Sequence, residues 1–369
     1  MLSIQDLRTE YRTDDGQLRA VDDVSFEVDR GQSFGLVGES GCGKSTVAKS
    51  IMRILPSNGK VAGGRIDFEG TDLTALPAAA MRRVRWQDVA LISQSAMNAL
   101  DPVYTVGAQI REAIEAHESA SREAMDARIA ELFELVGIDP ERMEDYPHQF
   151  SGGMKQRAMI AMALVLNPDL IIADEPTTAL DVISQDTILR HLDRLQAETG
   201  ASLLLITHDM SVVAEMCDRT GVMYAGQLAE VGPTEVIFDE PSHPYTLGLK
   251  NAFPTVRGDR DELISIPGSP PDLAAVDEGC RFAERCPFAT AECRSRTPPM
   301  ESRSEGHAAA CLRIDEIGPE TLRTRAANRA TWEEPSDVTP GTAGDERDET
   351  TEYGDVTRPG PGMESQEQP

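Results

Sequence analysis

The sequence predicts an α/β protein with a parallel sheet, a helical insertion and a small C-terminal accessory segment. Three observations carry this prediction. A glycine-rich loop, GESGCGKST, lies between an apolar strand and a helix. Two apolar runs, DLIIADE and ASLLLITHD, have the length and aliphatic content of buried parallel strands, and each precedes a helical pattern. Residues 104–139 place apolar side chains at helical spacing with few β-branched residues.

The N-terminal part, up to about residue 75, is predicted to form strands and turns around the glycine-rich loop. The expected strands are LSIQDLRTEY, AVDDVSFEV, QSFGLVG and GGRIDFEGTDL, and KSTVAKSIMRIL is the expected helix between the last two. We therefore expect a first domain over residues 1–250, with a helical subdomain at about 95–165.

Composition changes after about residue 250, where proline, glycine and cysteine become frequent and periodic segments become rare. This pattern predicts an accessory domain over residues 251–320. From residue 321 to 369 the chain is rich in Pro, Gly, Thr, Asp and Glu, and such a composition cannot offset the entropy of ordering. A disordered acidic tail is expected there.

The charge balance excludes nucleic acid as an expected partner. The chain has 369 residues and a formal net charge of -28, from 63 acidic and 35 basic residues, which repels polyanions. Only five of the basic residues are lysine, and an acidic, lysine-poor composition favours a salt-rich cytoplasm that screens self-repulsion. A merely acidic protein is the alternative. Neither a membrane-spanning apolar run nor a secretory leader is recognisable, so a cytoplasmic location is expected.

The loop GESGCGKST carries the spacing G-x-x-x-x-G-K-S/T of a phosphate-binding loop, in the strand–loop–helix context that this motif requires. Glycines let the backbone wrap around phosphates, backbone amides point at phosphate oxygens, and the lysine bridges the β- and γ-phosphates. The serine after the lysine is predicted to hold Mg²⁺. The predicted ATP-binding residues here are Gly38, Ser40, Gly41, Cys42, Gly43, Lys44, Ser45 and Thr46.

Three side chains at the ends of two apolar runs complete a hydrolytic site. Asp174 follows four apolar residues and can bind Mg²⁺ through water. Glu175 comes next and can act as general base on the water that attacks the γ-phosphate. His208 ends the other run, where its imidazole can hydrogen-bond the γ-phosphate. The predicted chemistry is ATP hydrolysis, with Glu175 and His208 as catalytic residues.

In this order, the motifs GESGCGKST, LISQSAMNALDP, FSGGMKQR, LIIADEPTTALD and LLLITHD resemble those of the ATP-binding subunits of ABC transporters, over roughly residues 1–320. The resemblance implies a RecA-like core with an antiparallel β-subdomain and a helical subdomain. It also implies a head-to-tail pair of subunits, in which the signature residues Ser151, Gly152 and Gly153 cover the partner's ATP.

The resemblance assigns further roles by position. Gln94 would contact Mg²⁺ and relay the nucleotide state, and the segment after it would face membrane subunits. Asp181 would communicate across the dimer. Tyr11 falls where an aromatic ring stacks on adenine. Phe150 and Met154 depart from the commoner L-S-G-G-Q signature, a variation expected to be tolerated because backbone amides do the binding.

Two C-terminal stretches, EVIFDEPSHPYTLGLKNAFP and SIPGSPPDL, resemble the extension found in the oligopeptide, dipeptide and nickel importer group. This resemblance implies a peripheral ATPase at the cytoplasmic face of the plasma membrane. Its expected partners are two integral membrane permease subunits, a second and non-identical ATPase subunit, and an extracytoplasmic solute-binding protein. The solute and the direction of transport stay open. The alternative is a soluble ABC-type ATPase without permeases, although the interval between the two nucleotide motifs holds only one helical insertion.

Four cysteines follow in the accessory segment, at Cys280, Cys286, Cys293 and Cys311. Their spacing fits zinc poorly, and a reducing compartment disfavours disulfides. Iron–sulfur clusters accept four thiolates at irregular spacing, and some members of the resembled group carry a four-iron cluster at similar cysteines. A [4Fe-4S] cluster is therefore expected, with zinc and free thiols as alternatives. Cys217 is expected in the core.

Overall fold

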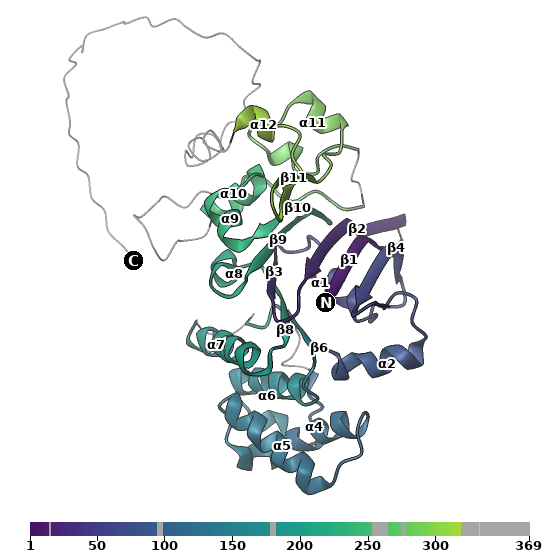
Figure 1. Cartoon of the computed structure of the whole chain (residues 1–369), viewed down its shortest axis with the longest axis vertical. Helices are drawn as coiled ribbons and strands as arrows, with labels where there is room; N and C mark the ends of the chain where they lie inside the picture. The colour runs from purple at the N-terminus through teal and green to yellow at the C-terminus, as the bar shows by residue number, and fades with distance from the viewer. Residues whose placement is uncertain are drawn as a thin grey trace, which may run out of the picture. The chain divides into compact units, whose positions relative to one another are not determined.

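The computed structural model describes residues 1–14, 16–93, 99–177, 182–252, 265–274, 278–318 and 332. Within these ranges two sheets carry the architecture (Figure 1). The strands are β1 (Leu2–Thr13), β2 (Gly16–Val28), β3 (Ser33–Val37), β4 (Gly59–Phe68), β5 (Thr71–Asp72), β6 (Val89–Ile92), β7 (Leu170–Asp174), β8 (Ser202–Thr207), β9 (Arg219–Tyr224), β10 (Gln227–Pro233), β11 (Glu301–Ser304) and β12 (His307–Ala309).

The larger sheet has the strand order β11-β12-β10-β9-β3-β8-β7-β6. Strands β9, β3, β8, β7 and β6 run parallel, and β10, β12 and β11 extend the sheet in antiparallel fashion. Every residue of β3, β7 and β8 is buried, as expected for parallel strands covered on both faces. The expected parallel sheet is therefore present, and strands from the C-terminal segment join it.

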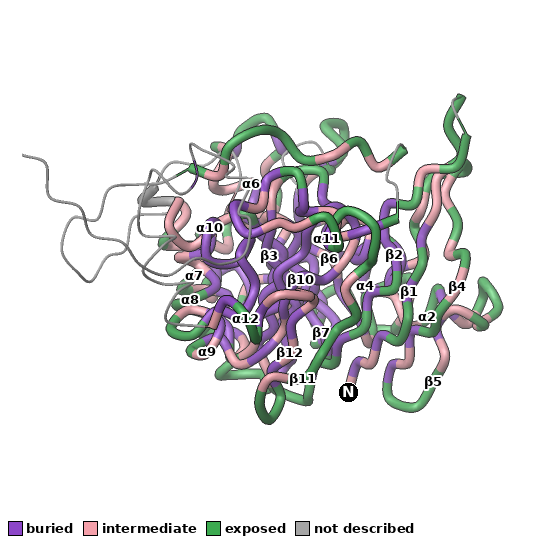
Figure 2. The backbone as a smooth tube through the Cα atoms, turned by 90° about the horizontal axis from the view of Figure 1, so that it is seen from above, coloured by how far each residue is buried: buried purple, intermediate pink, exposed green. Residues whose placement is uncertain are grey.

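The smaller sheet has the order β2-β1-β4-β5 and is antiparallel. Along β1 and β2 buried and exposed residues alternate, because one face of an antiparallel sheet packs on the core while the other meets solvent (Figure 2). This sheet corresponds to the antiparallel β-subdomain that the family resemblance implies.

The helices are α1 (Lys44–Ile51), α2 (Ala78–Gln87), α4 (Val106–Glu115), α5 (Arg122–Leu135), α6 (Gly152–Leu164), α7 (Val182–Thr199), α8 (Met210–Met216), α9 (Thr234–Asp239), α10 (Pro244–Asn251), α11 (Ala291–Ser295) and α12 (Ile314–Ile317). Short 3₁₀ turns occur at η1 (Pro140–Glu144), η2 (Pro147–Gln149) and η3 (Ala283–Arg285). Helices α4, α5 and α6 form the helical insertion below the large sheet in Figure 1.

Local sequence explains where these three helices begin. Thr105, Ser121 and Ser151 are their N-cap residues, and each side chain accepts a hydrogen bond from a backbone N–H in the first turn. Such caps satisfy donors that have no partner within the helix. The sequence signal for this part of the chain is therefore mostly local.

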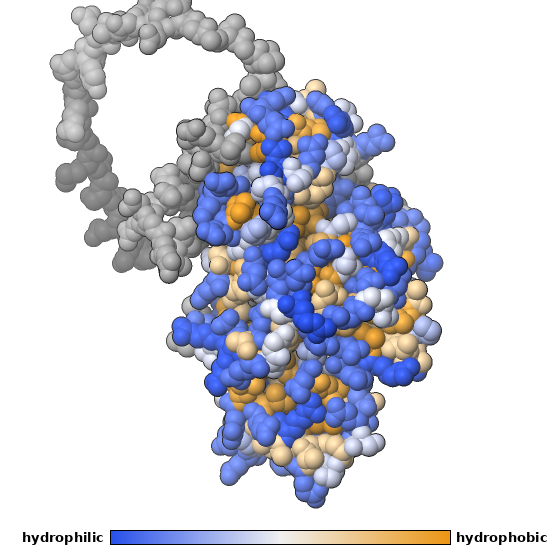
Figure 3. Space-filling model, viewed as in Figure 1, coloured by the Kyte–Doolittle hydropathy of each residue, from blue (hydrophilic) through white to orange (hydrophobic). Residues whose placement is uncertain are grey.

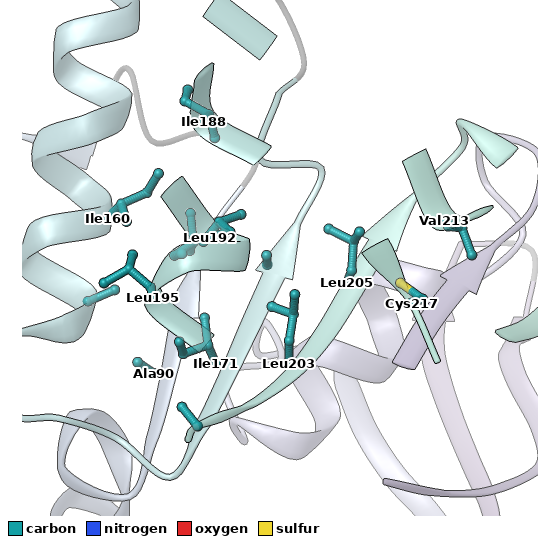
Figure 4. Packing of buried hydrophobic residues seen from close by; sticks show 14 of the residues in the cluster. Ala90, Ile160, Ile171, Ile188, Leu192, Leu195, Leu203, Leu205, Val213 and Cys217 are labelled. Atoms are coloured by element: carbon teal, nitrogen blue, oxygen red, sulfur yellow. The ribbon is translucent and has the colours of Figure 1, made fainter. Parts of the chain in front are cut away.

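The core between helices and sheet is aliphatic. In Figure 4 Leu192 and Leu195 of α7 lie between α6 and the strands of the sheet, and Val213 of α8 extends the same cluster beyond Leu205. All the labelled residues belong to one buried cluster: Ala90, Ile160, Ile171, Ile188, Leu192, Leu195, Leu203, Leu205, Val213 and Cys217. Burial also raises the pKa of the Cys217 thiol, which agrees with its predicted place in the core.

The surface differs from this interior. Hydrophilic residues cover most of the face shown in Figure 3, with apolar patches between them. Among the described helices, none combines the length and apolar character needed to span a lipid bilayer.

Candidate functional site

A cavity of about 570 Å³ lies at the carboxyl ends of the parallel strands, where β3 leads into the glycine-rich loop and β7 ends. Ligands of open α/β sheets bind at this edge. Its lining combines the loop, the small sheet, the end of β7 and a C-terminal stretch: Tyr11, Leu18, Ala20, Ser40, Gly41, Gly43, Lys44, Ser45, Thr46, Glu175, Pro271, Asp272 and Leu273. We call it the nucleotide cavity, after the ligand that the sequence predicts for it.

The phosphate loop has the backbone geometry that its glycines permit. Gly43 has a φ of 107°, and a Cβ there would lie 2.3 Å from the carbonyl oxygen of Ala20. Lys44 is only 4% exposed, and its Nζ donates to the carbonyl oxygens of Gly38 at 2.8 Å and Glu39 at 2.9 Å. The ammonium group is thus held inside the loop. Cys42 packs beneath it and is buried, as expected for a small loop residue.

The structure brings the two predicted Mg²⁺ ligands from α1 and β7 together. The hydroxyl Oγ of Ser45 donates to Oδ1 of Asp174 at 2.9 Å. Burial raises the pKa of Asp174, the hydrogen bond from Ser45 opposes this effect, and the neighbouring Glu175 adds to it. Two oxygen groups therefore face each other beside the phosphate loop, which is the donor type that Mg²⁺ prefers.

The two predicted catalytic residues are also neighbours. The distance between Nδ1 of His208 and Oε1 of Glu175 is 3.4 Å. Glu175 has a φ of 48°, an uncommon backbone conformation for a residue other than glycine, and its N–H donates to the carbonyl oxygen of Ile206 in β8. The turn after β7 thereby directs the Glu175 side chain into the nucleotide cavity.

Tyr11 lines the nucleotide cavity, at the end where Leu18 and Ala20 of β2 add apolar surface. Its hydroxyl lies 3.3 Å from the hydroxyl of Thr46, which ties the ring to the phosphate loop. A Cβ at Gly59 of β4 would lie 2.8 Å from the Tyr11 ring, so only a residue without a side chain leaves room for the ring there. The ring is thus available at the cavity wall, where the sequence expects it.

The signature residues lie at a different place. Ser151 is the N-cap of α6, where its Oγ accepts from the N–H of Met154 at 3.3 Å, and Gly152 and Gly153 form the first turn. As far as the structure describes its lining, the nucleotide cavity includes none of these three residues. Gln94 and Asp181 lie outside the described residues.

Three residues of the nucleotide cavity, Pro271, Asp272 and Leu273, were not expected at the site from the sequence. They belong to SIPGSPPDL, a stretch that the sequence analysis used only for its family resemblance. Tyr245 of the SHPYT stretch was missed for the same reason, and its hydroxyl accepts from the N–H of Glu39 in the phosphate loop at 3.0 Å. Nothing in the local pattern of either stretch signals a contact with the loop.

The four C-terminal cysteines line one small cavity of about 20 Å³, together with His243, Pro244, Phe282, Ala283, Phe288, Leu312, Arg313 and Ile317. Burial raises the pKa of Cys280 to about 11 and also raises the pKa of Cys286 and of Cys311. We call this place the cysteine cavity.

The predicted [4Fe-4S] cluster at Cys280, Cys286, Cys293 and Cys311 is not supported by this arrangement. Within the described ranges, no group of three or more His, Cys, Asp or Glu residues is placed so that it could hold a metal ion. None of the six cysteines is in a disulfide. The prediction relied on the cysteine spacing and on the family resemblance, and neither specifies the direction in which a thiol points. In the structure the four cysteines are free thiols, which was one of the alternatives.

Two family models match the chain. The model described as ABC transporter matches residues 21–178. The model described as oligopeptide/dipeptide transporter, C-terminal region, matches residues 229–293. The first range holds the phosphate loop, the signature residues and the end of β7. The second holds the SHPYT and SIPGSPPDL stretches and three of the four cysteines.

Curated proteins with similar sequences cover most of the chain. A probable peptide ABC transporter ATP-binding protein of Sinorhizobium fredii is 47% identical over 86% of this chain and 96% of its own length. The dipeptide transport ATP-binding protein DppD of Bacillus subtilis is 46% identical over 86% and 95%. The oligopeptide transport ATP-binding protein OppD of Haemophilus influenzae is 42% identical over 84% and 96%.

Solved structures match the fold. The ATP-binding cassette MJ0796, in a dimeric post-hydrolysis state with ADP and Pi, has a TM-score of 0.58 and 25% identity, and covers 63% of this chain and 99% of its own. The structure of cbiO1 from Clostridium perfringens, part of the transporter complex cbiONQ, has a TM-score of 0.54 and 26% identity, over 65% and 90%.

Proposed function

This chain belongs to the family of ABC transporter ATP-binding subunits, and from that premise we propose that it hydrolyses ATP to drive the uptake of peptides across the plasma membrane. The P-loop ABC ATPase fold predicted from the sequence is confirmed by the matching family model and cassette structures. The predicted assignment to the oligopeptide and dipeptide group is confirmed by the C-terminal family model and by the names of the relatives.

The observation that carries the proposal is the meeting of Lys44, Ser45 and Glu175 in one cavity. Lys44 supplies positive charge to the β- and γ-phosphates of ATP, and the backbone amides of the loop bind phosphate oxygens. Tyr11 stacks on adenine at the apolar end of the cavity. Ser45 and Asp174 would hold Mg²⁺, which neutralises charge on the phosphates when it is bound.

Hydrolysis requires a base and a group that senses the γ-phosphate. Glu175 accepts the proton of the attacking water, since its carboxylate reaches the nucleotide cavity from the end of β7. His208 lies 3.4 Å from that carboxylate, measured between Nδ1 and Oε1, so it can orient the carboxylate, and its imidazole would hydrogen-bond the γ-phosphate.

The signature residues Ser151, Gly152 and Gly153 act on the ATP of a second ATPase subunit. Two facts support this: they begin α6 away from the nucleotide cavity, and the similar cassette MJ0796 has been solved as a dimer. A helix N-terminus is suited to phosphate, because its free N–H groups and dipole favour negative charge. Asp181 would communicate across this dimer and Gln94 would relay the nucleotide state. We propose a non-identical partner for the second position.

Two membrane permease subunits and a solute-binding protein complete the proposed importer, with this chain at the cytoplasmic face. Support for a docking surface comes from Val103 and Tyr104, just before α4, which are 68% and 57% exposed. Exposed apolar side chains of this size are typical of protein contacts when they lie together. They belong to the segment that the sequence assigns to the permease contact.

A reconstitution experiment tests the proposal. The chain, its partner ATPase and the membrane subunits are purified together and placed in vesicles with the binding protein. We expect ATP hydrolysis that rises when a peptide-loaded binding protein is added, and peptide accumulation that ceases with Lys44→Ala. Hydrolysis by a chain that never co-purifies with membrane proteins would instead favour the soluble ATPase alternative.

Salt adaptation is a further part of the proposal, and the acidic, lysine-poor composition supports it. At ~1 M salt the Debye length is about 3 Å, so self-repulsion between surface carboxylates is screened. We expect the melting temperature to rise by several degrees between dilute buffer and 2 M KCl. A melting temperature that is as high in dilute buffer would contradict this prediction.

A further inference from the structure

Part of the lining of the nucleotide cavity comes from a segment that is distant in sequence from the phosphate loop. Pro271, Asp272 and Leu273 line it together with residues of the phosphate loop and of the small sheet. The N–H of Ala274 donates to Oδ1 of Asp272 at 2.9 Å, which forms a tight turn with Leu273 at its centre. The same cavity is therefore shared by parts of the chain that both family models match separately.

The chemistry of this wall suits a nucleoside rather than phosphates. Pro271 and Leu273 present apolar side chains, and phosphates require donors or cations instead. Leu273 is half-buried and packs on the core. Tyr11, Leu18 and Ala20 also line this cavity with apolar surface. A purine ring bound in the cavity could therefore contact apolar side chains of both the small sheet and the C-terminal segment.

A buried arginine holds the base of this wall. Arg285, in η3, donates from Nε to the carbonyl oxygen of Pro267 at 2.8 Å and from Nη2 to that of Ile266 at 3.4 Å. The Ile266 side chain packs at Gly248 of α10, where a Cβ would lie 2.8 Å from it. Backbone and side chain are thus both fixed at the start of SIPGSPPDL.

The same arginine reaches the phosphate loop. Its Nη1 and Nη2 form a two-pronged ion pair with the carboxylate of Glu39, at 2.6 and 2.9 Å, and its side chain is 6% exposed. Paired N–H···O bonds between arginine and a carboxylate fix orientation as well as distance. The N–H of Glu39 in turn donates to Tyr245. Arg285 therefore connects the phosphate loop with the segment that carries Leu273.

We propose that residues 266–273 are part of the ATP-binding site: Pro271 and Leu273 form the apolar wall opposite Tyr11, and Arg285 is the positioning residue that fixes this wall to the phosphate loop through Glu39. This inference rests on the proposed function, because it takes the cavity to bind ATP. It deepens that function, since it makes the C-terminal segment a determinant of nucleotide affinity.

Residues 266–273 are expected to affect the affinity for ATP and not the rate of its hydrolysis. The apolar side chains of Pro271 and Leu273 carry no group that can transfer a proton, so their loss acts on ATP binding and leaves the hydrolytic step at saturating ATP unchanged. Leu273→Ser is expected to raise the Kd of ATP about fivefold to tenfold, because part of a leucine side chain no longer shields the base from water.

The first experiment measures ATP binding to the full chain by equilibrium dialysis, with inorganic triphosphate as competitor. Leu273→Ser should weaken ATP while the inhibition constant of triphosphate stays within twofold of wild type. Met300→Ala is the matched control, since Met300 is an exposed C-terminal apolar residue outside the cavity lining. An unchanged Kd, or an equal loss for ATP and triphosphate, would overturn the proposal. Should Leu273→Ser lower the folded fraction, Pro271→Ser carries the same test.

The second experiment tests the positioning role in the reconstituted complex. Arg285→Gln and Glu39→Gln should each raise KM for ATP about tenfold, with kcat within twofold. The double variant should be no worse than Arg285→Gln alone, because the ion pair with Glu39 is already lost in that variant. Arg294→Gln is the control, because Arg294 pairs with Glu284 at the surface. A fall in kcat without a change in KM, or additive effects of the two variants, would contradict the positioning role.

Lys44→Ala distinguishes failure of this inference from failure of the proposed function. If wild type binds no ATP, the proposed function fails. If Lys44→Ala loses ATP binding while the Leu273 and Arg285 variants keep wild-type values, only the inference fails.

Discussion

The nucleotide cavity and the cysteine cavity differ in volume and in the residues that line them. The first measures about 570 Å³, and two of its lining residues pair with polar side chains beside it, Ser45 with Asp174 and Glu175 with His208. The second measures about 20 Å³ and is lined by thiols, Phe282, Phe288 and the imidazole of His243. Polar side chains at the nucleotide cavity therefore have hydrogen-bonding partners, whereas those of the cysteine cavity are surrounded mainly by apolar side chains.

This comparison shows how burial and hydrogen bonds change the pKa of a side chain and so decide whether it is charged. In the nucleotide cavity burial raises the pKa of Asp174, but the hydrogen bond from Ser45 counters it. In the cysteine cavity burial raises the pKa of Cys280 to about 11 and lowers the pKa of His243 to about 4. A hydrogen bond thus favours the charged carboxylate beside the first cavity, whereas burial in the second favours the neutral forms of Cys280 and His243.

The largest expected effect falls on the nucleotide cavity. Glu175→Gln should retain ATP binding and lower kcat by a factor on the order of 10² or more, because the general base is lost while the shape of the cavity is kept. Turnover by the reconstituted complex and equilibrium dialysis of ATP provide the two readouts. Wild-type turnover in this variant would assign the base to another residue and weaken the contrast between the cavities.

His243 gives the cysteine cavity a measurable pH dependence. Its pKa is lowered to about 4 by burial, which a hydrogen bond with the backbone of Ala310 partly offsets, against 6.5 when unfolded. The unfolded chain therefore binds a proton first as pH falls, so stability present above pH 6.5 is lost progressively toward pH 4. The full shift corresponds to about 3 kcal/mol.

Denaturant unfolding between pH 7 and pH 4.5 measures this dependence. His243→Asn is the matched variant, since the Nδ1 of His243 accepts from the N–H of Tyr245 as an N-cap and asparagine caps helices well without titrating. The variant should show a shallower loss of stability with falling pH. If the free energy of unfolding fell equally with pH in wild type and variant, His243 would not be the cause of the pH dependence.

Gly43→Ala tests the steric fit of the phosphate loop. A Cβ at Gly43 would lie 2.3 Å from the carbonyl oxygen of Ala20, and its φ is 107°. Gly41 is the matched control, because its φ is also positive, at 80°, but a Cβ there meets nothing within 4 Å. We expect Gly43→Ala to cost about 1–3 kcal/mol more in unfolding free energy than Gly41→Ala. Equal costs would show that backbone strain alone matters.

The smallest expected effect concerns thiol reactivity. With a pKa of about 11, Cys280 carries little thiolate at neutral pH, so alkylation should be roughly tenfold or more slower than in the urea-unfolded chain. Its rate should rise with pH well beyond pH 9. Peptide-resolved mass spectrometry after timed iodoacetamide treatment measures both. Iron and absorbance near ~400 nm in anaerobically purified protein would contradict a cavity of neutral thiols and restore the cluster prediction.

Much of the nucleotide cavity follows from local sequence. GESGCGKST dictates its own loop, because a strand, glycines with positive φ and a helix start can connect in few ways. Apolar runs that end in Asp174, Glu175 and His208 place these residues at one edge of a parallel sheet. The structure describes them there, although their roles and those of Gln94 and Asp181 stay predictions.

The arrangement of the thiols in the cysteine cavity could not be predicted from the local sequence. Spacing and resemblance suggested four metal ligands, but the direction of a thiol depends on the packing around Phe282, His243 and the neighbouring turns. The contact between Arg285 and Glu39 was missed for the same reason, because no periodic pattern links residues from opposite ends of the chain.

The sequence by itself determined the order of the elements, the phosphate loop and the chemistry at the strand ends, since each depends on neighbours a few residues apart. Only the tertiary structure decided that Pro271 and Leu273 line the nucleotide cavity and that the four C-terminal thiols share a small cavity without a metal-holding arrangement among the described residues. The physical reason is that contacts between distant segments are selected by close packing over the whole core, which no local rule specifies.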